Sequence, residues 1–318
     1  MLPVLAMAFL VSLFYSRINT LLDETSKVIP KMEYILNTID SNDMVIIGAS
    51  RAFYHYNPRI IDSVCNIKSY NLGMDGSNIV EQNMVLHTYL QHHPVPKVVL
   101  LNVDGFEFDS KEVVYNDLDY MPYLKVPEVK KTIGSYEHFK YSLLAPLFLL
   151  ERDCSLPDDK VKVHALFSSD DTLLSVFKEE GEEKYYGEAY NGYQANNAPL
   201  EADVNDPVKI FPVNYDTEGL NILVNMIQFC KSKHITPVFV YGPLYHTYTK
   251  KFPGCETLMN KIAVIAEQNN VLYLDYSKAG YSSDSSCFYN IQHLNGKGSA
   301  LFSKQVAMDL KRSINWHE

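Results

Sequence analysis

The stretch Asp43-Met-Val-Ile-Ile-Gly-Ala-Ser50-Arg51 decides the fold of this chain. Its apolar run, Val45 to Ile47, is followed at once by small residues, which is typical of a buried parallel strand that ends in a tight turn. Ligands of open α/β sheets bind outside the carboxyl ends of such strands, so Ser50 lies where a nucleophile would be useful. The stretch alone also fits a plainer role, because serine is a favoured N-cap of a following helix.

Further strands and helices alternate along the chain around this first strand. The pattern predicts strands at residues 44–48, 67–70, 97–103, 237–241 and 271–275. It predicts helices that start near residue 57 and cover about 79–92, 136–152, 217–233, 256–269 and 297–314. Strands separated by helices of this length imply right-handed crossovers and a parallel sheet covered on both faces. We therefore expect an α/β three-layer sandwich.

Two parts of the chain depart from this alternation. Residues 106–205 combine one predicted helix with charged linkers and a tyrosine-rich loop, and we interpret them as an insertion over the carboxyl-end face of the sheet. Residues 1–40 read as a signal anchor followed by a lead-in helix that is kinked or restarted at Pro30. The main domain then covers residues 41–318.

The segment Leu2 to Tyr15 is almost entirely apolar, but it is shorter than the ~20 residues that a membrane span requires. Its length fits the apolar core of a signal peptide better, although the basic leader and a cleavage site are missing. We interpret it as part of a signal anchor, which predicts contact with the membrane and an extracytoplasmic location. A buried N-terminal helix is the alternative.

Composition narrows the classes of partner and cofactor. The formal net charge is −10 without any basic run, which argues against nucleic acid as a partner. The five cysteines lie far apart without a CxxC spacing, so neither a metal site nor a disulfide framework is indicated. A glycine-rich phosphate fingerprint is also missing, and we expect no cofactor.

Small and polar residues follow several of the predicted strands and precede the last helix. They are Ser50, the turn Asn71-Leu-Gly-Met-Asp-Gly76, the segment Asn102-Val-Asp104, and the loop Asn290-Ile-Gln-His293-Leu-Asn-Gly-Lys-Gly298. Histidine is the most frequent general base for a serine nucleophile. A histidine held just before a helix could reach across the sheet edge to Ser50.

In these blocks the chain resembles the SGNH, or GDSL-like, hydrolase superfamily. Gly48-Ala-Ser50-Arg resembles the nucleophile block in the style of extracytoplasmic, polysaccharide-related members, and His293-Leu-Asn-x-x-Gly298 resembles the terminal block. The resemblance covers about residues 43–105 and 235–312. It implies a flavodoxin-like sheet, Ser50 as nucleophile and His293 as base, with an oxyanion hole formed by the amides of Ser50 and Gly76 and by Asn102.

Two positions depart from the family pattern. Asn290 stands where the family has the aspartate that orients the histidine, and it brings no negative charge to the imidazolium. Asp284, in the same loop, is a possible alternative acid. In the third block Val103 is the simplest match to the family asparagine, and Asn102 supplies an oxyanion donor only after a small shift of register. A missing donor typically costs about 10²–10³ in rate.

Each candidate residue also has a structural interpretation. His293 could cap a helix in a structural turn, and Gly76 could be required by a positive φ, which would still expose its amide. Arg51 could bind an anionic group or pair with an acidic side chain, and we favour pairing. The tyrosine-rich loop could stack on sugar rings, but packing is the more frequent role of such clusters.

From the residues and the resemblance together we expect a serine esterase or acyltransferase. Its substrate would carry an ester, in particular an O-acetyl group on an extracytoplasmic glycan. The alternative is a catalytically weakened scaffold or carbohydrate-binding component of envelope polysaccharide assembly, which the replacement of the aspartate by Asn290 suggests.

Overall fold

The computed structural model describes residues 26–111, 114, 117–133, 185–201 and 210–316. The chain divides into two compact units. One unit contains Met1–Met32 and Asp117–Lys184, and the other contains Glu33–Asn116 and Tyr185–Glu318. All residues of the predicted site belong to the second unit.

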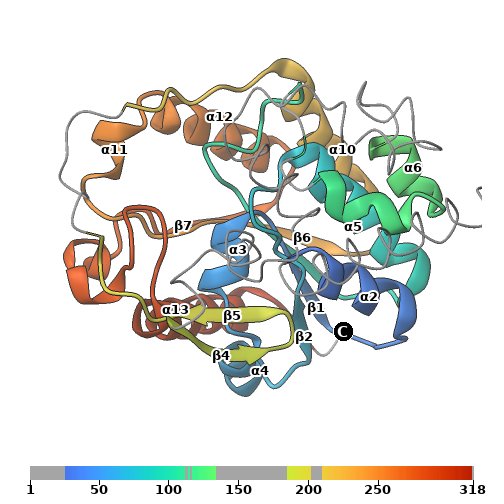
Figure 1. Cartoon of the computed structure of the whole chain (residues 1–318), viewed down its shortest axis with the longest axis horizontal. Helices are drawn as coiled ribbons and strands as arrows, with labels where there is room; N and C mark the ends of the chain where they lie inside the picture. Colours follow the sequence, from blue (N-terminus) through green and yellow to red (C-terminus); the bar gives the residue numbers. More distant parts are fainter. Residues whose placement is uncertain (1–25, 112–113, 115–116, 134–184, 202–209, 317–318) are drawn as a thin grey trace, which may run out of the picture. The chain divides into compact units, whose positions relative to one another are not determined.

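The second unit is built on a five-stranded parallel sheet (Figure 1). The strands are β1 (Met44–Ile47), β2 (Ser69–Asn71), β3 (Val98–Asn102), β6 (Thr236–Tyr241) and β7 (Leu272–Asp275), in the order β2-β1-β3-β6-β7. This confirms the predicted sheet. The strand order is the flavodoxin-like one, in which the chain reverses direction across the sheet between β1 and β3.

Helices cover both faces of this sheet. They are α3 (Ser50–His55), α4 (Pro58–Cys65), α5 (Ile79–His92), α10 (Thr217–Ser232), α11 (Tyr248–Lys251), α12 (Cys255–Gln268) and α13 (Gly296–Ser313). α5, α10 and α12 lie on one side, and α4 and α13 pack together on the other (Figure 1). Because both faces are covered, every residue of β1 and β3 is buried. The sequence of β1, and that of β3 up to Asn102, is a continuous apolar run rather than an alternating one.

The helix starts agree with local capping chemistry. The Asn57 side chain accepts a hydrogen bond from the Arg59 amide, and Pro58 occupies the first turn of α4. The Asn295 side chain accepts from the Gly298 amide at the start of α13. A polar cap therefore fixes where each of these helices begins.

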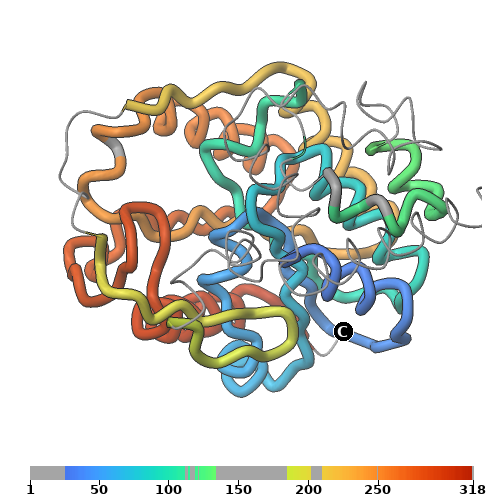
Figure 2. The backbone as a smooth tube through the Cα atoms, viewed as in Figure 1, coloured from blue at the N-terminus to red at the C-terminus, as the bar shows by residue number. Residues whose placement is uncertain are grey.

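Segments distant in the sequence meet at the carboxyl end of β1. Ile47 of β1 aligns with Leu101 of β3, so the turns that follow these two strands are neighbours. The tube in Figure 2 shows the blue segment after β1 beside the red C-terminal segment, and α13 packs against both α3 and α4. This arrangement brings the beginning and the end of the domain to one edge of the sheet.

The tyrosine-rich segment was expected to be a loop, and that expectation is wrong. It forms the antiparallel hairpin β4 (Tyr186–Tyr190) and β5 (Tyr193–Asn196). Its turn, Asn191-Gly192, has positive φ angles of 44° and 81°, and Asn-Gly is the dipeptide that such two-residue turns prefer. The sequence therefore contains the Asn-Gly signal of a hairpin turn, but the tyrosine-rich residues around it favoured the interpretation as a loop.

The first unit contributes few described elements. They are the 3₁₀ helix η1 (Asp117–Tyr123) and α6 (Pro127–Ile133). The helix predicted at 136–152 and the apolar segment Leu2 to Tyr15 lie outside the described residues. α2 (Ile29–Asn37) has Pro30 in its first turn, as a restarted lead-in helix would. Among the residues described, no helix combines the length and the apolar character that crossing a membrane would need.

Candidate active site

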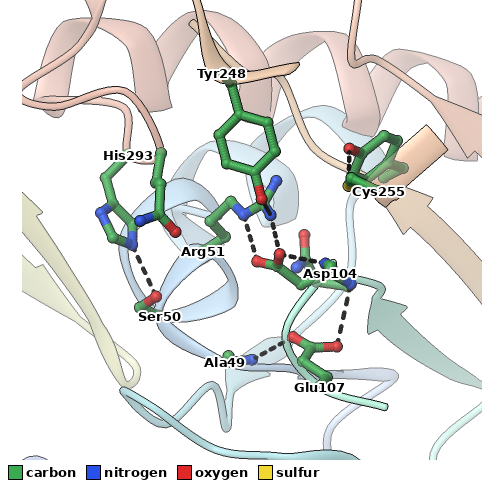
Figure 3. A network of polar contacts seen from close by, with 12 residues as sticks. Ala49, Ser50, Arg51, Asp104, Glu107, Tyr248, Cys255 and His293 are labelled. Carbon is green, nitrogen blue, oxygen red and sulfur yellow. Dashed lines mark hydrogen bonds and ion pairs between the residues drawn. The ribbon is translucent and has the colours of Figure 1, made fainter. Parts of the chain in front are cut away.

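Ser50 is the first residue of α3, directly after the turn that ends β1. The N-cap position belongs to Ala49, and the Ser50 hydroxyl lies 2.7 Å from Nε2 of His293. The structural alternative, in which Ser50 caps the helix, is therefore wrong. Its side chain points away from the helix backbone and toward the C-terminal loop (Figure 3).

The geometry joins Ser50, His293 and Asn290 in one chain of contacts. Nδ1 of His293 lies 3.0 Å from Oδ1 of Asn290, and Nε2 faces the hydroxyl of Ser50, although Ser50 and His293 are 243 residues apart in the sequence. A carbonyl oxygen can only accept, so Nδ1 carries the hydrogen and Nε2 is free to accept the serine proton. This is the tautomer that a general base needs.

The orientation of the Asn290 amide is set by the backbone of its own turn. Oδ1 also accepts hydrogen bonds from the amides of Gln292, at 2.9 Å, and His293, at 2.8 Å. Backbone N–H groups cannot bond to the amide nitrogen, so the oxygen must face His293. Asn290 therefore reproduces the orienting role of an aspartate, without its charge.

Asp284 does not take the position of the missing acid. One of its oxygens accepts hydrogen bonds from the hydroxyl and the amide of Ser286, and Lys297 pairs with the other at 3.4 Å. The bonds from Ser286 lower the pKa of Asp284 to about 2. Nδ1 of His293 is engaged by Asn290 instead, so Asp284 acts in its own turn.

Two aromatic rings surround the imidazole of His293. Tyr289 is nearly parallel to it, with ring centroids 5.3 Å apart, and Tyr54 meets it edge-on at 5.7 Å. The amide of Tyr289 also donates to the carbonyl oxygen of His293 at 3.1 Å. The loop is thus closed on itself, and the imidazole has restricted freedom to turn away from Ser50.

The sequence predicts the amides of Ser50 and Gly76 and the side chain of Asn102 as oxyanion donors, and the surroundings of Gly76 and Asn102 differ. Gly76 has a φ of 69°, a conformation that favours glycine, and lies in the turn after β2. That turn is held against the turn after β1, because the Met74 amide and the Ser77 hydroxyl both donate to the carbonyl oxygen of Gly48. The roles of the Ser50 and Gly76 amides as oxyanion donors stay predictions.

Asn102 is directed into the interior at the end of β3. Its side chain is buried, and Oδ1 accepts a hydrogen bond from the Tyr56 hydroxyl at 2.8 Å. Within the described part of the chain, its Nδ2 atom has no hydrogen-bond partner. The structure thus places the Asn102 side chain beside Tyr56 at the end of β3.

Arg51 forms a buried ion pair with Asp104, which confirms the expectation that it pairs with an acidic residue. Its Nε and Nη2 atoms each donate to one carboxylate oxygen of Asp104, and Nη2 also donates to the Tyr248 hydroxyl at 3.3 Å (Figure 3). Arg51 is fully buried, so it cannot bind a substrate anion without a rearrangement. Losing either partner would leave an uncompensated buried charge.

Glu107 holds the other side of the turn after β1, and the sequence pattern did not indicate this role. Its carboxyl oxygens accept from the amide of Ala49, at 3.2 Å, and from the amide of Asp104, at 3.1 Å. Burial raises the pKa of Glu107 to about 8, which the positive charge of Arg51 only partly opposes. Ser50 is thus flanked by two anchor points, Ala49 and Arg51, both fixed to the turn after β3. Glu107 lies inside the segment interpreted as an insertion, which is why its role was not apparent.

No group of three or more metal-binding side chains occurs among the residues that the structure describes. The site itself offers the serine, the histidine and the surrounding hydrogen-bond donors. The arrangement suits proton transfer from Ser50 to His293 and attack of the serine oxygen on a carbonyl carbon.

Comparisons with known proteins give structural similarity alone. No family model and no curated protein matches the sequence. A candidate lipolytic protein of the G-D-S-L family from Desulfitobacterium hafniense has 11% identity and a TM-score of 0.41, covering 84% of this chain and 99% of its own. A candidate acylhydrolase from Bacteroides fragilis has 11% identity and a TM-score of 0.38, covering 90% of this chain and 95% of its own. The chemistry of this chain rests on its own site.

Proposed function

We propose that this protein is an ester-cleaving serine enzyme of the SGNH type. The observation that carries the proposal is the contact of 2.7 Å between the Ser50 hydroxyl and Nε2 of His293, with Nδ1 held by Asn290. A serine that only packs or caps does not require an imidazole in this tautomer. The strand-end position of Ser50 places the hydroxyl where sheets of this type bind ligands.

The reaction would proceed in two steps. The Ser50 oxygen attacks the ester carbonyl carbon while its proton moves to Nε2 of His293, and the carbonyl electrons form an oxyanion. The intermediate then expels the alcohol, which takes the proton from His293, and leaves an acyl group on Ser50. Water, or a hydroxyl of an acceptor molecule, attacks the acyl group with His293 as base and releases Ser50.

For the substrate we propose an acylated glycan, in particular one that carries O-acetyl groups. The support is the Gly48-Ala-Ser50-Arg block, which resembles extracytoplasmic, polysaccharide-related members of the superfamily, and the apolar N-terminal segment. Under this proposal the protein acts outside the cytoplasmic membrane and contacts the membrane through that segment. The acceptor of the acyl group, water or a sugar hydroxyl, separates an esterase from an acyltransferase.

A non-catalytic scaffold is the second candidate, because Asn290 supplies no negative charge to an imidazolium. In serine proteases the corresponding loss of the aspartate lowers kcat by about 10⁴. The orientation of the Asn290 oxygen favours catalysis, since the tautomer needed for a base is kept. The two candidates therefore differ in whether Ser50 reacts.

A fluorophosphonate probe tests this difference directly. The wild-type protein is expected to become labelled on Ser50, and Ser50→Ala is expected to lose labelling while keeping its circular dichroism spectrum. Ser283→Ala, a change at an exposed serine of η4 (Gly280–Ser283), is the matched control and should label like the wild type. Folded wild-type protein that does not label would favour the scaffold. A separate assay tests the proposed substrate by measuring the release of acetate from acetylated glycans. Protein already labelled by the fluorophosphonate gives the background rate.

A further inference from the structure

His55 is the last residue of α3, the helix that begins with Ser50, and it has no part in the reaction described above. Its side chain is completely buried. The imidazole meets the ring of His293 edge-on, with centroids 6.1 Å apart, and meets Phe302 of α13 at the same centroid distance. A buried histidine between the nucleophile helix and the base-bearing loop calls for a physical explanation.

The contacts of His55 connect these two parts of the chain. Its Nε2 atom accepts a hydrogen bond of 3.0 Å from the backbone amide of Leu294, the residue after His293. Its carbonyl oxygen accepts from the hydroxyls of Ser299 and Ser303 on α13, each at 3.0 Å. One residue thus holds α3 to both the loop and the helix that follow His293.

The protonation state of His55 follows from its surroundings. Burial lowers the pKa of His55 well below its ordinary value, and the nearby charges of His293 and Arg51 act in the same direction. The imidazole is therefore neutral, with Nε2 as acceptor and the hydrogen on Nδ1. A protonated His55 could not accept from Leu294 and would place a positive charge beside His293.

We propose that His55 is a positioning residue for the reaction of Ser50. By accepting the Leu294 amide, it fixes the backbone at His293 relative to the helix that carries the nucleophile. The inference rests on the proposed function, because it assigns His55 a purpose in aligning Ser50 and His293. Small misplacements of reacting groups, of about 1 Å, can cost on the order of 10² in rate.

Two substitutions separate alignment from simple packing. His55→Phe keeps a ring but removes the acceptor, whereas His55→Gln keeps an oxygen that can reach the position of Nε2. We expect His55→Phe to lower kcat for p-nitrophenyl acetate, and the rate of fluorophosphonate labelling, at least tenfold, with KM unchanged. We expect His55→Gln to stay within about threefold of the wild type. His92→Phe and His92→Gln, at an exposed histidine of α5, form the matched control pair.

A second measurement does not depend on activity. Nitrogen-detected NMR of ¹⁵N-histidine-labelled protein, with His55→Phe used for assignment, reports the tautomer and charge of each imidazole. His55 is expected to be neutral with the hydrogen on Nδ1 at pH 6.5, where an ordinary histidine is half protonated. In His55→Phe the signal of His293 is expected to shift, because its contact with Ser50 is loosened.

Failure of the positioning role of His55 can be told apart from failure of the proposed function, because wild-type labelling tests the function and the His55 variants test the positioning. If the wild type does not label, the proposed function fails, and a His55 that is neutral and bonded through Nε2 would then be a structural group only. If the wild type labels, equal kcat in folded His55→Phe and wild type would overturn the positioning role. Equal losses in His55→Phe and His55→Gln, or a His55 that titrates like an exposed histidine, would overturn it as well.

Discussion

At the scale of the residue, Asn290 shows how a turn can assign a role to a side chain. Three N–H groups converge on its Oδ1 atom, two from the backbone and one from the imidazole of His293. Such a cluster of donors would stabilise a carboxylate even better than an amide oxygen. The site is therefore built to accept an aspartate at this position.

We predict that Asn290→Asp increases the reactivity of Ser50. The carboxylate would keep the same three hydrogen bonds and add a negative charge next to the imidazolium that forms during attack. We expect kcat and the labelling rate to rise at least tenfold. The gain should stay below the factor of about 10⁴ lost by the opposite change in serine proteases, because that loss comes from the wrong tautomer, which Asn290 already avoids. Stopped-time labelling and p-nitrophenyl acetate hydrolysis measure both quantities.

Gln292→Glu is the control for this prediction, because it adds a charge to the same loop at a half-buried position whose side chain is not placed on Nδ1. It should change the rate far less than Asn290→Asp does. A rate in Asn290→Asp that is equal to or below that of the wild type would show that charge at this position does not limit the reaction.

At the scale of the element, α3 is held in place by the close approach of the turn after β2. Gly73 in that turn has no room for a side chain, since an added Cβ would lie 2.5 Å from the backbone nitrogen of Phe53 in α3. Its amide donates to the Asn71 side chain at 2.8 Å, which fixes the turn. The position of Ser50 thus depends on backbone contact between the first two βα turns.

We predict that Gly73→Ala destabilises the protein and lowers the reactivity of Ser50 together. Overpacking of this kind typically costs about 1–3 kcal/mol, and the relief of the clash would move α3 away from the turn. Differential scanning fluorimetry should show a lower Tm, and labelling of the folded protein should slow at least fivefold. Gly280→Ala is the matched control, because an added Cβ there would meet nothing within 4 Å. Equal Tm values for the two variants would refute the close-packing argument.

At the scale of the whole molecule, the sheet order determines the site. Because β1 lies between β2 and β3, the turns after all three strands meet at one edge, and α13 packs against the helices that follow β1. A hydroxyl at residue 50 and an imidazole at residue 293 then meet, although 243 residues separate them in the sequence. The same packing buries Glu107, Asp104 and Arg51 beside the turn after β1.

The buried Glu107 carboxyl predicts a pH dependence of stability. Its pKa is raised from 4.5 to about 8 in the folded protein, so between these values the folded state holds a proton that the unfolded state releases. The free energy of unfolding should therefore fall as pH rises through this interval, by at most about 1.4 kcal/mol per pH unit. Glu107→Gln removes this contribution.

Measured across that interval, the Tm of the wild type should fall relative to the Tm of Glu107→Gln as the pH increases. Asp62, whose pKa is raised from 3.8 to about 6, acts in the same direction at lower pH. His55, whose pKa is lowered, acts in the opposite direction below its ordinary value of 6.5. Asp62 and His55 are present in the wild type and in Glu107→Gln alike, so their contributions cancel in the difference between the two Tm values. A difference in Tm that does not change with pH would contradict the prediction.

Much of the fold was predictable because its signals are local. The apolar runs at Val45–Ile47 and in residues 97–103 indicate strands buried on both faces, and Asn57-Pro58 indicates where a helix begins. The hairpin was missed although Asn191-Gly192 has the composition of its turn. Neighbouring strands that bear mostly polar and tyrosine residues do not show the apolar alternation by which strands are recognised.

By itself, the sequence determined the five strands of the sheet, the helix start at Asn57-Pro58 and the chemical identity of Ser50, Asn290 and His293, because these depend on neighbouring residues. Only the tertiary structure decided that the Asn290 oxygen faces Nδ1, that Asp284 is engaged elsewhere, and that Arg51 is paired with Asp104. It also decided the placement of Glu107 and His55, whose partners are distant in the sequence. The physical reason is that a hydrogen bond depends on distance and direction, and the packing of helices on the sheet sets both.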